Sequence, residues 1–274
     1  MDADLKSIAA ARRCADTAFE AYRQFLGTDP SKIDAIVDAM ANAIEPEVNR
    51  IVELAVAETG YGNAKDKRIK DMFNAVSVAD YLRDVTTLGM LWKDDATKVA
   101  AFGEPMGLVA ALIPVTNPTS TIIYKVLSAV KAGNAIVCAP HPRALRCGLE
   151  VTRLLANVAE QMGAPKGLIQ CLEHVTIQGT AELMSHKRTS VVMATGGPAM
   201  VKAAYSSGKP TLAVGAGNVP CYVNKSKAND IAEVAEQIVV SKSFDYGTAC
   251  VSEQAVVVDK EIARELRNEL KLKG

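Results

Sequence analysis

The first 90 residues of the chain carry their apolar side chains at the spacing of α-helices. One helical stripe consists of Ile8, Ala15, Phe19, Tyr22 and Leu26. A second stripe, which the pair Asp29-Pro30 can begin, consists of Ile33, Ile36, Val37, Met40 and Ile44. Pro46 can start a third helix that ends at Gly60, and a fourth runs from about Lys65 to Asp84. No strand signal interrupts this region, so we expect residues 1–90 to be helical.

From Val99 onward, short apolar runs rich in β-branched residues alternate with helical stretches. The apolar runs span residues 108–113, 135–138, 168–172, 191–193 and 212–214. The helical stretches span residues 118–131, 143–162, 177–186 and 198–207, and Gly133, Gly163 and Gly208 lie where helices end. Strands that are apolar throughout belong to parallel sheets covered on both faces. The pattern therefore predicts the α/β class, with a doubly wound parallel sheet preceded by a helical segment.

After residue 219 the chain shows a strand at 220–223, a helix at about 228–241 and a strand at 255–258. An irregular link at 244–250 joins that helix to the last strand. Beyond Asp259, an apolar helical stripe of Ile262, Leu266 and Leu270 needs other residues to cover it.

Glycine, proline and polar residues follow the predicted strands. Their segments are 114–118, 139–143, 173–174, 194–197 and 215–218. Doubly wound sheets bind ligands at the carboxyl ends of their strands, so these segments predict a ligand crevice, although turns favour the same residue types. The candidate cofactor-binding residues at this edge are Pro114, Thr116, His141, Pro142, Arg143, Thr195, Gly196, Gly197, Val214 and Gly215.

Three of these candidates, Thr195, Gly196 and Gly197, lie between a strand and a helix that Pro198 can start. Backbone N–H groups and a helix N-terminus at such a turn can face a phosphate. The segment is not a G-x-G-x-x-G motif, so a plain tight turn is the favoured interpretation of the segment by itself. His141 and Arg143 can contact a phosphate or a ribose, or form a solvated loop.

Cys250 differs from the other cysteines because it lies in the irregular link, and loops often carry reactive groups. A thiolate adds readily to carbonyls, and its thioester remains an acyl donor. Asn117 can supply an uncharged donor to the oxyanion that such an addition forms. The alternatives are a buried structural cysteine at position 250 and a helix N-cap at position 117.

Composition narrows the classes of partner. Lys and Arg together number 31, as do Asp and Glu, so no net field favours nucleic acid or an anionic membrane. The first residues lack the apolar core of a signal peptide, and no apolar run is long enough for a membrane span. Six cysteines without a C-x-x-C pair suit free thiols in a reducing cytoplasm, and three histidines without ligand spacing predict no metal.

Five segments in order resemble the successive motifs of the CoA-acylating aldehyde dehydrogenases, within the aldehyde dehydrogenase superfamily. They are FGEPMGLVAALIPVTNPTS, APHPRA, ATGGPAMVKAAYSSGKP, VGAGNVP and SKSFDYGTACVSEQ, which fall within residues 99–258. This branch includes the acetaldehyde dehydrogenase half of bifunctional aldehyde-alcohol dehydrogenases. The resemblance implies a Rossmann-like N-terminal domain of that family.

Carried onto this sequence, the resemblance makes Cys250 the nucleophile and Asn117 the oxyanion donor, assisted by the backbone N–H of Cys250. It places Thr195, Gly196 and Gly197 in the nucleotide site. In this family a short aldehyde adds to the cysteine, hydride passes to NAD or NADP, and coenzyme A takes the acyl group, all reversibly. Acetaldehyde, propionaldehyde, sulfoacetaldehyde and succinate semialdehyde are substrates of similar proteins.

Two substitutions favour the acylating branch over hydrolytic relatives. Hydrolytic enzymes carry E-L-G-G-K, whose glutamate activates water, whereas Ala213 stands in that place here. A thiol needs much less help from a base than water does, so acyl transfer to CoA tolerates this loss. The pair His141-Pro142 replaces the Lys-Pro that hydrolytic relatives place at the ribose.

Members of this family are much longer than 274 residues. We therefore expect a dinucleotide-binding domain at 1–242, including the N-terminal helices, and at 243–274 the start of a catalytic domain whose remainder is absent. The resemblance further implies a cytoplasmic homodimer or higher homo-oligomer, in some relatives within a bacterial microcompartment. The alternatives are a non-catalytic nucleotide-binding or assembly module, and a hydrolytic aldehyde dehydrogenase.

Overall fold

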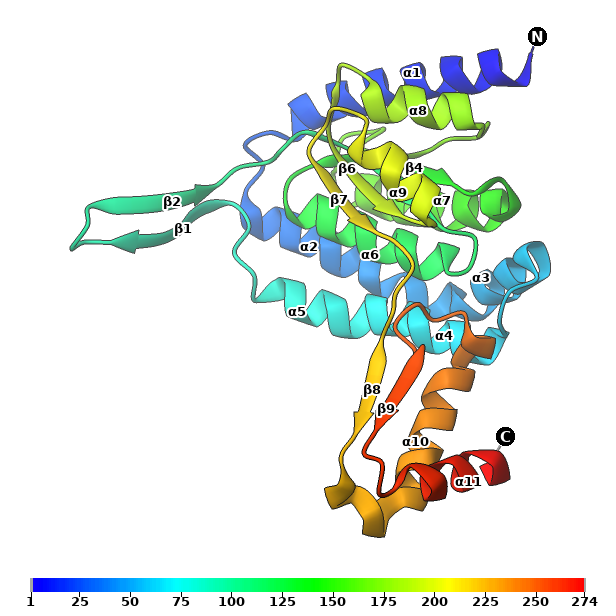
Figure 1. Ribbon diagram of the computed structural model, residues 1–274. Helices are drawn as coiled ribbons and strands as arrows, with labels where there is room; N and C mark the ends of the chain where they lie inside the picture. The colour runs from blue at the N-terminus through cyan, green and yellow to red at the C-terminus, as the bar shows by residue number, and fades with distance from the viewer. Residues whose placement is uncertain (1, 274) are drawn as a thin grey trace.

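The computed structural model describes residues 2–273, and its centre is a five-stranded parallel sheet (Figure 1). The strands are β3 (Leu108–Ile113), β4 (Ala135–Pro140), β5 (Ile169–Cys171), β6 (Thr189–Thr195) and β7 (Thr211–Val214), in the spatial order β5-β4-β3-β6-β7. Every residue of β3 and β4 is buried, as strands covered on both faces require. The predicted doubly wound α/β fold is confirmed.

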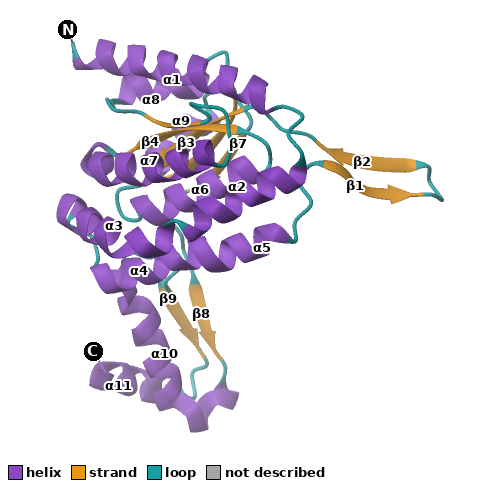
Figure 2. Ribbon diagram, turned by 180° about the vertical axis from the view of Figure 1, so that it is seen from behind, coloured by secondary structure: helices purple, strands orange, loops and turns teal. Residues whose placement is uncertain are grey.

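Helices cover both faces of this sheet (Figures 1 and 2). The crossover helices α6 (Pro118–Lys131) and α7 (Leu145–Gln161) lie on one face, together with α2 (Pro30–Asn42). The other face is covered by α8 (Ile177–Ser185) and α9 (Pro198–Tyr205), with α1 (Ala3–Phe25). The direction of winding changes between β3 and β6, which are neighbours in the sheet. The carboxyl ends of these two strands therefore form the topological switch point, where folds of this kind bind ligands.

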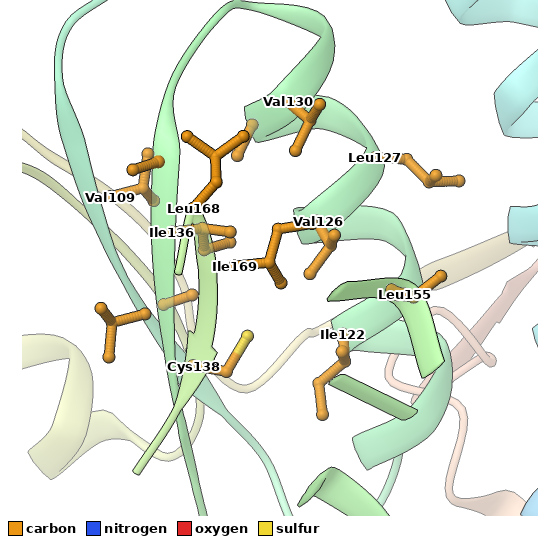
Figure 3. Close-up of a cluster of buried hydrophobic side chains, with 14 of the residues drawn as sticks. Val109, Ile122, Val126, Leu127, Val130, Ile136, Cys138, Leu155, Leu168 and Ile169 are labelled. Atoms are coloured by element: carbon orange, nitrogen blue, oxygen red, sulfur yellow. The ribbon is translucent and has the colours of Figure 1, made fainter. Parts of the chain in front are cut away.

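The layer between the sheet and α6 forms a close-packed apolar core (Figure 3). Val109 and Ile136 from the strands pack with Ile122 and Val126 of α6 and Leu155 of α7, all fully or almost fully buried. Each such side chain contributes about 1.5–3 kcal/mol relative to an exposed position. This packing fixes the strand ends from which the candidate site is built.

The N-terminal region is helical up to residue 83, as predicted. Its helices are α1 (Ala3–Phe25), α2 (Pro30–Asn42), α3 (Ile44–Thr59), α4 (Ala64–Met72) and α5 (Ala79–Arg83). Asp29 caps α2 by accepting from Ser31 N at 2.9 Å, and Gly60 ends α3 in the left-handed conformation. The predicted fourth helix is interrupted by a π-helical turn, η1 (Phe73–Val78), which the apolar spacing did not reveal.

A two-stranded antiparallel hairpin, β1 (Gly89–Asp94) and β2 (Val99–Gly103), projects from the body of the molecule (Figure 1). The sequence pattern did not predict this hairpin. Most of its residues are exposed, including Trp92 and Phe102, so the sequence lacks the alternation of apolar and polar positions that marks a half-buried strand.

Residues 220–273 form a second, smaller group around its own apolar cluster. Its elements are β8 (Pro220–Val223), η3 (Lys225–Asp230), α10 (Ile231–Ser243), η4 (Phe244–Gly247), β9 (Ala255–Val258) and α11 (Ala263–Lys273), with β8 and β9 parallel. Ile262 and Leu266 are buried against Val223 and Ile231, so α10 and β8 cover most of the C-terminal apolar stripe. This cluster has members on both sides of residue 242, and the domain boundary there stays a prediction.

No helix among residues 2–273 combines the length and the apolar composition needed to cross a membrane.

Candidate active site

Cys250 is the most accessible thiol in the described part of the chain. It lies in a turn between η4 and β9 and is exposed, whereas Cys138 and Cys147 are buried and the remaining three cysteines are half-buried. Burial raises the pKa of Cys138 to about 12 and also raises the pKa of Cys147, Cys14 and Cys171, which keeps these thiols protonated. The structure does not support a buried structural role for Cys250.

Asn117 lies directly after β3 at the start of α6, but its side chain does not cap that helix. Its Nδ2 donates instead to the carbonyl oxygen of Thr248 at 3.1 Å and to Thr116 Oγ1 at 3.2 Å. Thr248 is two residues before Cys250. The carboxamide of Asn117 is therefore in direct contact with the segment that carries the exposed thiol.

The carboxylate of Asp245 joins this segment to α4. Asp245 is fully buried, and its Oδ2 accepts from Lys67 Nζ at 3.0 Å, from Lys70 Nζ and from Thr248 Oγ1 at 2.6 Å. Its Oδ1 accepts from Asn63 N at 2.8 Å. Burial alone would raise the pKa of this carboxyl, but its hydrogen bonds, the one from Lys70 foremost, hold the pKa below the ordinary value.

The same two lysines also bind the residues that end β3. Lys67 Nζ donates to the carbonyl oxygen of Thr116 at 2.8 Å, and Lys70 Nζ donates to Asn117 Oδ1. Asp245 and Asn117 therefore share Lys70 as a common donor. Burial lowers the pKa of Lys70, and the hydrogen bond to Asp245 opposes that shift.

The backbone around Asp245 adopts a rare conformation. Asp245, Tyr246 and Gly247 have φ values of +50°, +55° and +71°, three left-handed residues in succession, of which two are not glycine. Such strain persists only where the surroundings fix it, and it clusters at functional sites. Here the fixing contacts come from the buried carboxylate.

Gly62 leaves room for that carboxylate. A Cβ at Gly62 would lie 1.9 Å from Asp245 Oδ1, and the residue also has a φ of +68°. The loop between α3 and α4 can thus approach Asp245 closely enough for Asn63 N to bind it.

The sequence pattern did not predict Lys67, Lys70 and Asp245 as residues of this site. Lys67 is 2% exposed, whereas Ile69 on the same helix is 50% exposed, so α4 turns charged rather than aliphatic side chains inward. Six of the nine residues of this helix are charged, and such a composition gives the pattern of a solvated surface. The only signal available from the sequence was that this short helix has too little apolar surface to dock by itself.

Asp71 lies beside these lysines and is 1% exposed. It accepts from Thr119 Oγ1 at 2.9 Å, while its Oδ2 is buried with no hydrogen-bond partner among the described residues. Burial raises its pKa to about 7, although the Thr119 hydroxyl and the two lysines favour the charged form.

The predicted nucleotide segment lies at the end of β6, at the switch point. Gly196 N donates to the carbonyl oxygen of Val214 at 3.1 Å, which ties this turn to the end of β7. A Cβ at Gly197 would meet nothing within 4 Å, so the backbone there borders open space just before α9 begins at Pro198. The chain after Gly215 then approaches residues 245–251, the segment that carries Cys250 and that is called the nucleophile segment below after its predicted role, because a Cβ at Gly217 would lie 2.5 Å from the carbonyl oxygen of Cys250.

The predicted residues after β4 already have protein partners. Arg143 donates from Nη2 to the carbonyl oxygen of Thr59 at 2.9 Å and lies over the ring of Tyr61. His141 accepts from Arg143 N through Nδ1 at 3.1 Å, and burial followed by the charge of Arg143 lowers the pKa of His141. Pro142 begins the short turn that follows. His141 is therefore neutral at pH 7, and because its Nδ1 accepts from Arg143 N, its Nε2 carries the ring proton.

Of the twelve candidates, Asn117 contacts Thr116 and also Thr248, which lies two residues before Cys250. Thr195, Gly196, Gly197, Val214 and Gly215 share the ends of β6 and β7, and Pro114 leads from β3 towards Thr116. His141 and Arg143 lie one strand further along the same edge. Their roles in binding a cofactor stay predictions. Within residues 2–273, no group of three His, Cys, Asp or Glu side chains is arranged to hold a metal.

Comparison with known proteins gives matches along the whole chain. The model of the aldehyde dehydrogenase family matches residues 1–273. Among curated proteins, aldehyde-alcohol dehydrogenase 2 of Entamoeba histolytica is 42% identical over 243 residues, which cover 89% of this chain and 28% of that protein. The bifunctional aldehyde-alcohol dehydrogenase of Escherichia coli is 38% identical over 239 residues, covering 87% and 27%.

Solved structures agree with these matches. An acetylating aldehyde dehydrogenase from Geobacillus thermoglucosidasius superposes with a TM-score of 0.94 at 49% identity, covering 100% of this chain and 60% of that one. A propionaldehyde dehydrogenase from Rhodopseudomonas palustris, solved with bound CoA and an acylated cysteine, gives a TM-score of 0.84 at 32% identity, covering 96% and 60%. The chain thus spans about a quarter of the curated relatives and about 60% of the solved ones.

Replacing Asp71 by Asn tests its raised pKa. Between the ordinary value of 3.8 and about 7, the folded protein keeps a proton that the unfolded chain loses. The contribution of this proton to stability is therefore complete below pH 4 and is lost as the pH rises to 7, with a slope approaching about 1.4 kcal/mol per pH unit. Urea unfolding from pH 4 to pH 8 should show that Asp71→Asn removes this slope. The exposed control Asp84→Asn should keep it, and equal slopes in wild type and Asp71→Asn would show that Asp71 titrates normally.

A pair of glycines tests the docking of the nucleophile segment on the α3–α4 loop. Gly60 and Gly62 both have positive φ values, but only at Gly62 would a Cβ meet Asp245. Overpacking costs about 1–3 kcal/mol, so Gly62→Ala should speed amide hydrogen exchange in residues 245–251 about tenfold or more. Gly60→Ala carries the same backbone strain without the clash and should leave that exchange near the wild-type rate. Equal acceleration in both variants would contradict the contact.

Proposed function

The chain belongs to the aldehyde dehydrogenase family, and from that premise we propose that it forms the cofactor edge and nucleophile segment of a CoA-acylating aldehyde dehydrogenase. The reaction converts a short-chain aldehyde, CoA and NAD+ or NADP+ to acyl-CoA and NAD(P)H, reversibly, through a thioester on Cys250. One observation carries the proposal: the exposed thiol lies two residues beyond the carbonyl that Asn117 binds.

Cys250 is proposed as the nucleophile. Its thiolate adds to the aldehyde carbon, and the carbonyl oxygen becomes an oxyanion within reach of the residues around Thr248. Asn117 Nδ2 and the backbone N–H of Cys250 are the proposed donors to that oxyanion. In the structure, both Nδ2 hydrogens of Asn117 have acceptors, Thr248 O and Thr116 Oγ1, so an oxyanion would take the place of one of them.

The ends of β3, β4, β6 and β7 are proposed to hold the dinucleotide, which would accept hydride from the carbon bonded to the Cys250 sulfur. The open space at Gly197 and the helix that follows fit a phosphate close to the backbone. Neutral His141 is proposed to face the ribose, together with Arg143, whose Nη2 already donates to the carbonyl oxygen of Thr59. Residues 1–242 would then be the dinucleotide-binding domain, and residues 243–274 the start of the catalytic domain.

Acyl transfer to CoA is favoured over hydrolysis because no carboxylate occupies position 213. Ala213 lies within β7, paired with Ala194 of β6, so the strand provides no base there to activate water. A thiol acceptor ionises far more readily than water, so CoA can take the acyl group from the Cys250 thioester without such a base. Cytoplasmic location and assembly into homo-oligomers belong to the same proposal.

Kinetics test this function directly. We expect the protein to form NAD(P)H from at least one of acetaldehyde, propionaldehyde, sulfoacetaldehyde and succinate semialdehyde, only when CoA is present. Cys250→Ala should reduce this rate to background, because the other five cysteines are buried or half-buried and cannot replace the proposed nucleophile. The control Cys221→Ala changes a half-buried cysteine of β8 and should retain the wild-type rate. NAD(P)H formation without CoA, with free acid as the product, would favour a hydrolytic enzyme.

A further inference from the structure

The contact between Lys70 and Asn117 decides which way the Asn117 carboxamide faces. An ammonium group can only donate hydrogen bonds, so the carboxamide atom in contact with Lys70 Nζ must be the oxygen. The amide nitrogen then faces Thr248 and the nucleophile segment. Without Lys70, the contacts of Nδ2 with Thr248 and Thr116 would be the remaining ones that favour this orientation over the flipped one, which turns an acceptor towards the segment.

The position of Lys70 is fixed in turn by Asp245. Lys70 Nζ contacts Asp245 Oδ2, and the same carboxylate oxygen accepts from Thr248 Oγ1 at 2.6 Å. Asn117, Lys70, Asp245 and Thr248 therefore form a closed ring of hydrogen bonds. The ring returns to Asn117 through the carbonyl oxygen of Thr248, so the orientation of the carboxamide and the position of the Cys250 segment depend on each other.

The charges behind the carboxamide act in the same direction. Lys67 and Lys70 bring two positive charges to the buried Asp245, so the charges of these three residues sum to a positive value next to Asn117 Oδ1. A cation at the oxygen of an amide polarises the group and strengthens its N–H donors. Buried ion pairs add little to stability compared with apolar packing, so stability alone does not explain charged residues at the docking face of α4.

We propose that Lys70 is a positioning residue for the oxyanion site: held by Asp245, it fixes Asn117 with its N–H donors towards the Cys250 segment. This inference rests on the proposed function, in which Asn117 stabilises the oxyanion. Lys70 itself does not touch the reacting atoms. Its effect passes through Asn117, so removing Lys70 should matter only while Asn117 is present.

Kinetic coupling between the two residues is the first test. Lys70→Met should lower kcat/KM for the aldehyde by about 100-fold, close to the loss of one oxyanion donor. Asn117→Ala should cause a loss of similar size, and the double variant should be no slower than Asn117→Ala alone. Lys70→Arg, whose side chain can also only donate, should recover at least tenfold of the loss. Independent, multiplying effects of Lys70→Met and Asn117→Ala would overturn the proposal.

Alkylation of Cys250 by iodoacetamide separates positioning from a general structural effect. This displacement forms no oxyanion, so Lys70→Met should alter its rate by less than about threefold while the aldehyde reaction falls. The control Lys65→Met, an exposed lysine of the same helix, should change neither rate. A parallel fall in alkylation and aldehyde oxidation would mean that Lys70 maintains the segment as a whole, and would overturn the specific role.

The orientation of the carboxamide can be observed without any catalysis. In a two-dimensional ¹H–¹⁵N spectrum, the pair of signals that Asn117→Ala removes belongs to the Asn117 side chain. Lys70→Met should move this pair to the position of an exposed carboxamide, and Lys65→Met should leave it in place. If the wild type oxidises no aldehyde, the proposed function fails, yet this spectrum still decides the role of Lys70. If the Asn117 signals stay unchanged in Lys70→Met, the positioning role of Lys70 is overturned.

Discussion

The buried carboxylate of Asp245 is the constraint on which the candidate site depends. A carboxylate removed from water is unfavourable unless its oxygens are fully hydrogen-bonded, and here two lysines, a threonine hydroxyl and a backbone N–H bind it. These donors come from the α3–α4 loop, from α4 and from the nucleophile segment. Satisfying one anion therefore brings three distant stretches of the chain to a single point beside the end of β3.

This constraint explains how residues 245–247 can be irregular in backbone conformation and still be held in one position. The left-handed residues 245–247 would be unfavourable in an unsupported turn, but the bonds to Asp245 hold them. The same lysines bind Thr116 and Asn117 at the switch point of a rigid, fully buried sheet. These contacts fix the position of the nucleophile segment relative to the sheet. A reactive thiol on a turn needs such a fixed position, because reaction rates depend on the geometry of the reacting atoms.

The sheet could be predicted from the sequence because its strands are short, mainly apolar runs with glycine or proline close to their ends. Cys250 and Asn117 could be proposed as site residues because their motifs are local in sequence. Lys67, Lys70 and Asp245 could not, since their partners are up to 182 residues away and a charged helix face resembles a solvated one. The hairpin at 89–103 could not be predicted for the opposite reason. It packs against so little of the chain that burial imposed no pattern of apolar and polar residues on it.

A thioester on Cys250 is the central chemical claim, and mass spectrometry can observe it in the reverse direction. Incubating the reduced protein with acetyl-CoA in the absence of a dinucleotide, then digesting it at low pH, should yield one acetylated cysteine peptide, the one containing Cys250. Added free CoA should remove the label by reversing the transfer. Acetylation spread over several cysteines, or none at Cys250, would contradict the account.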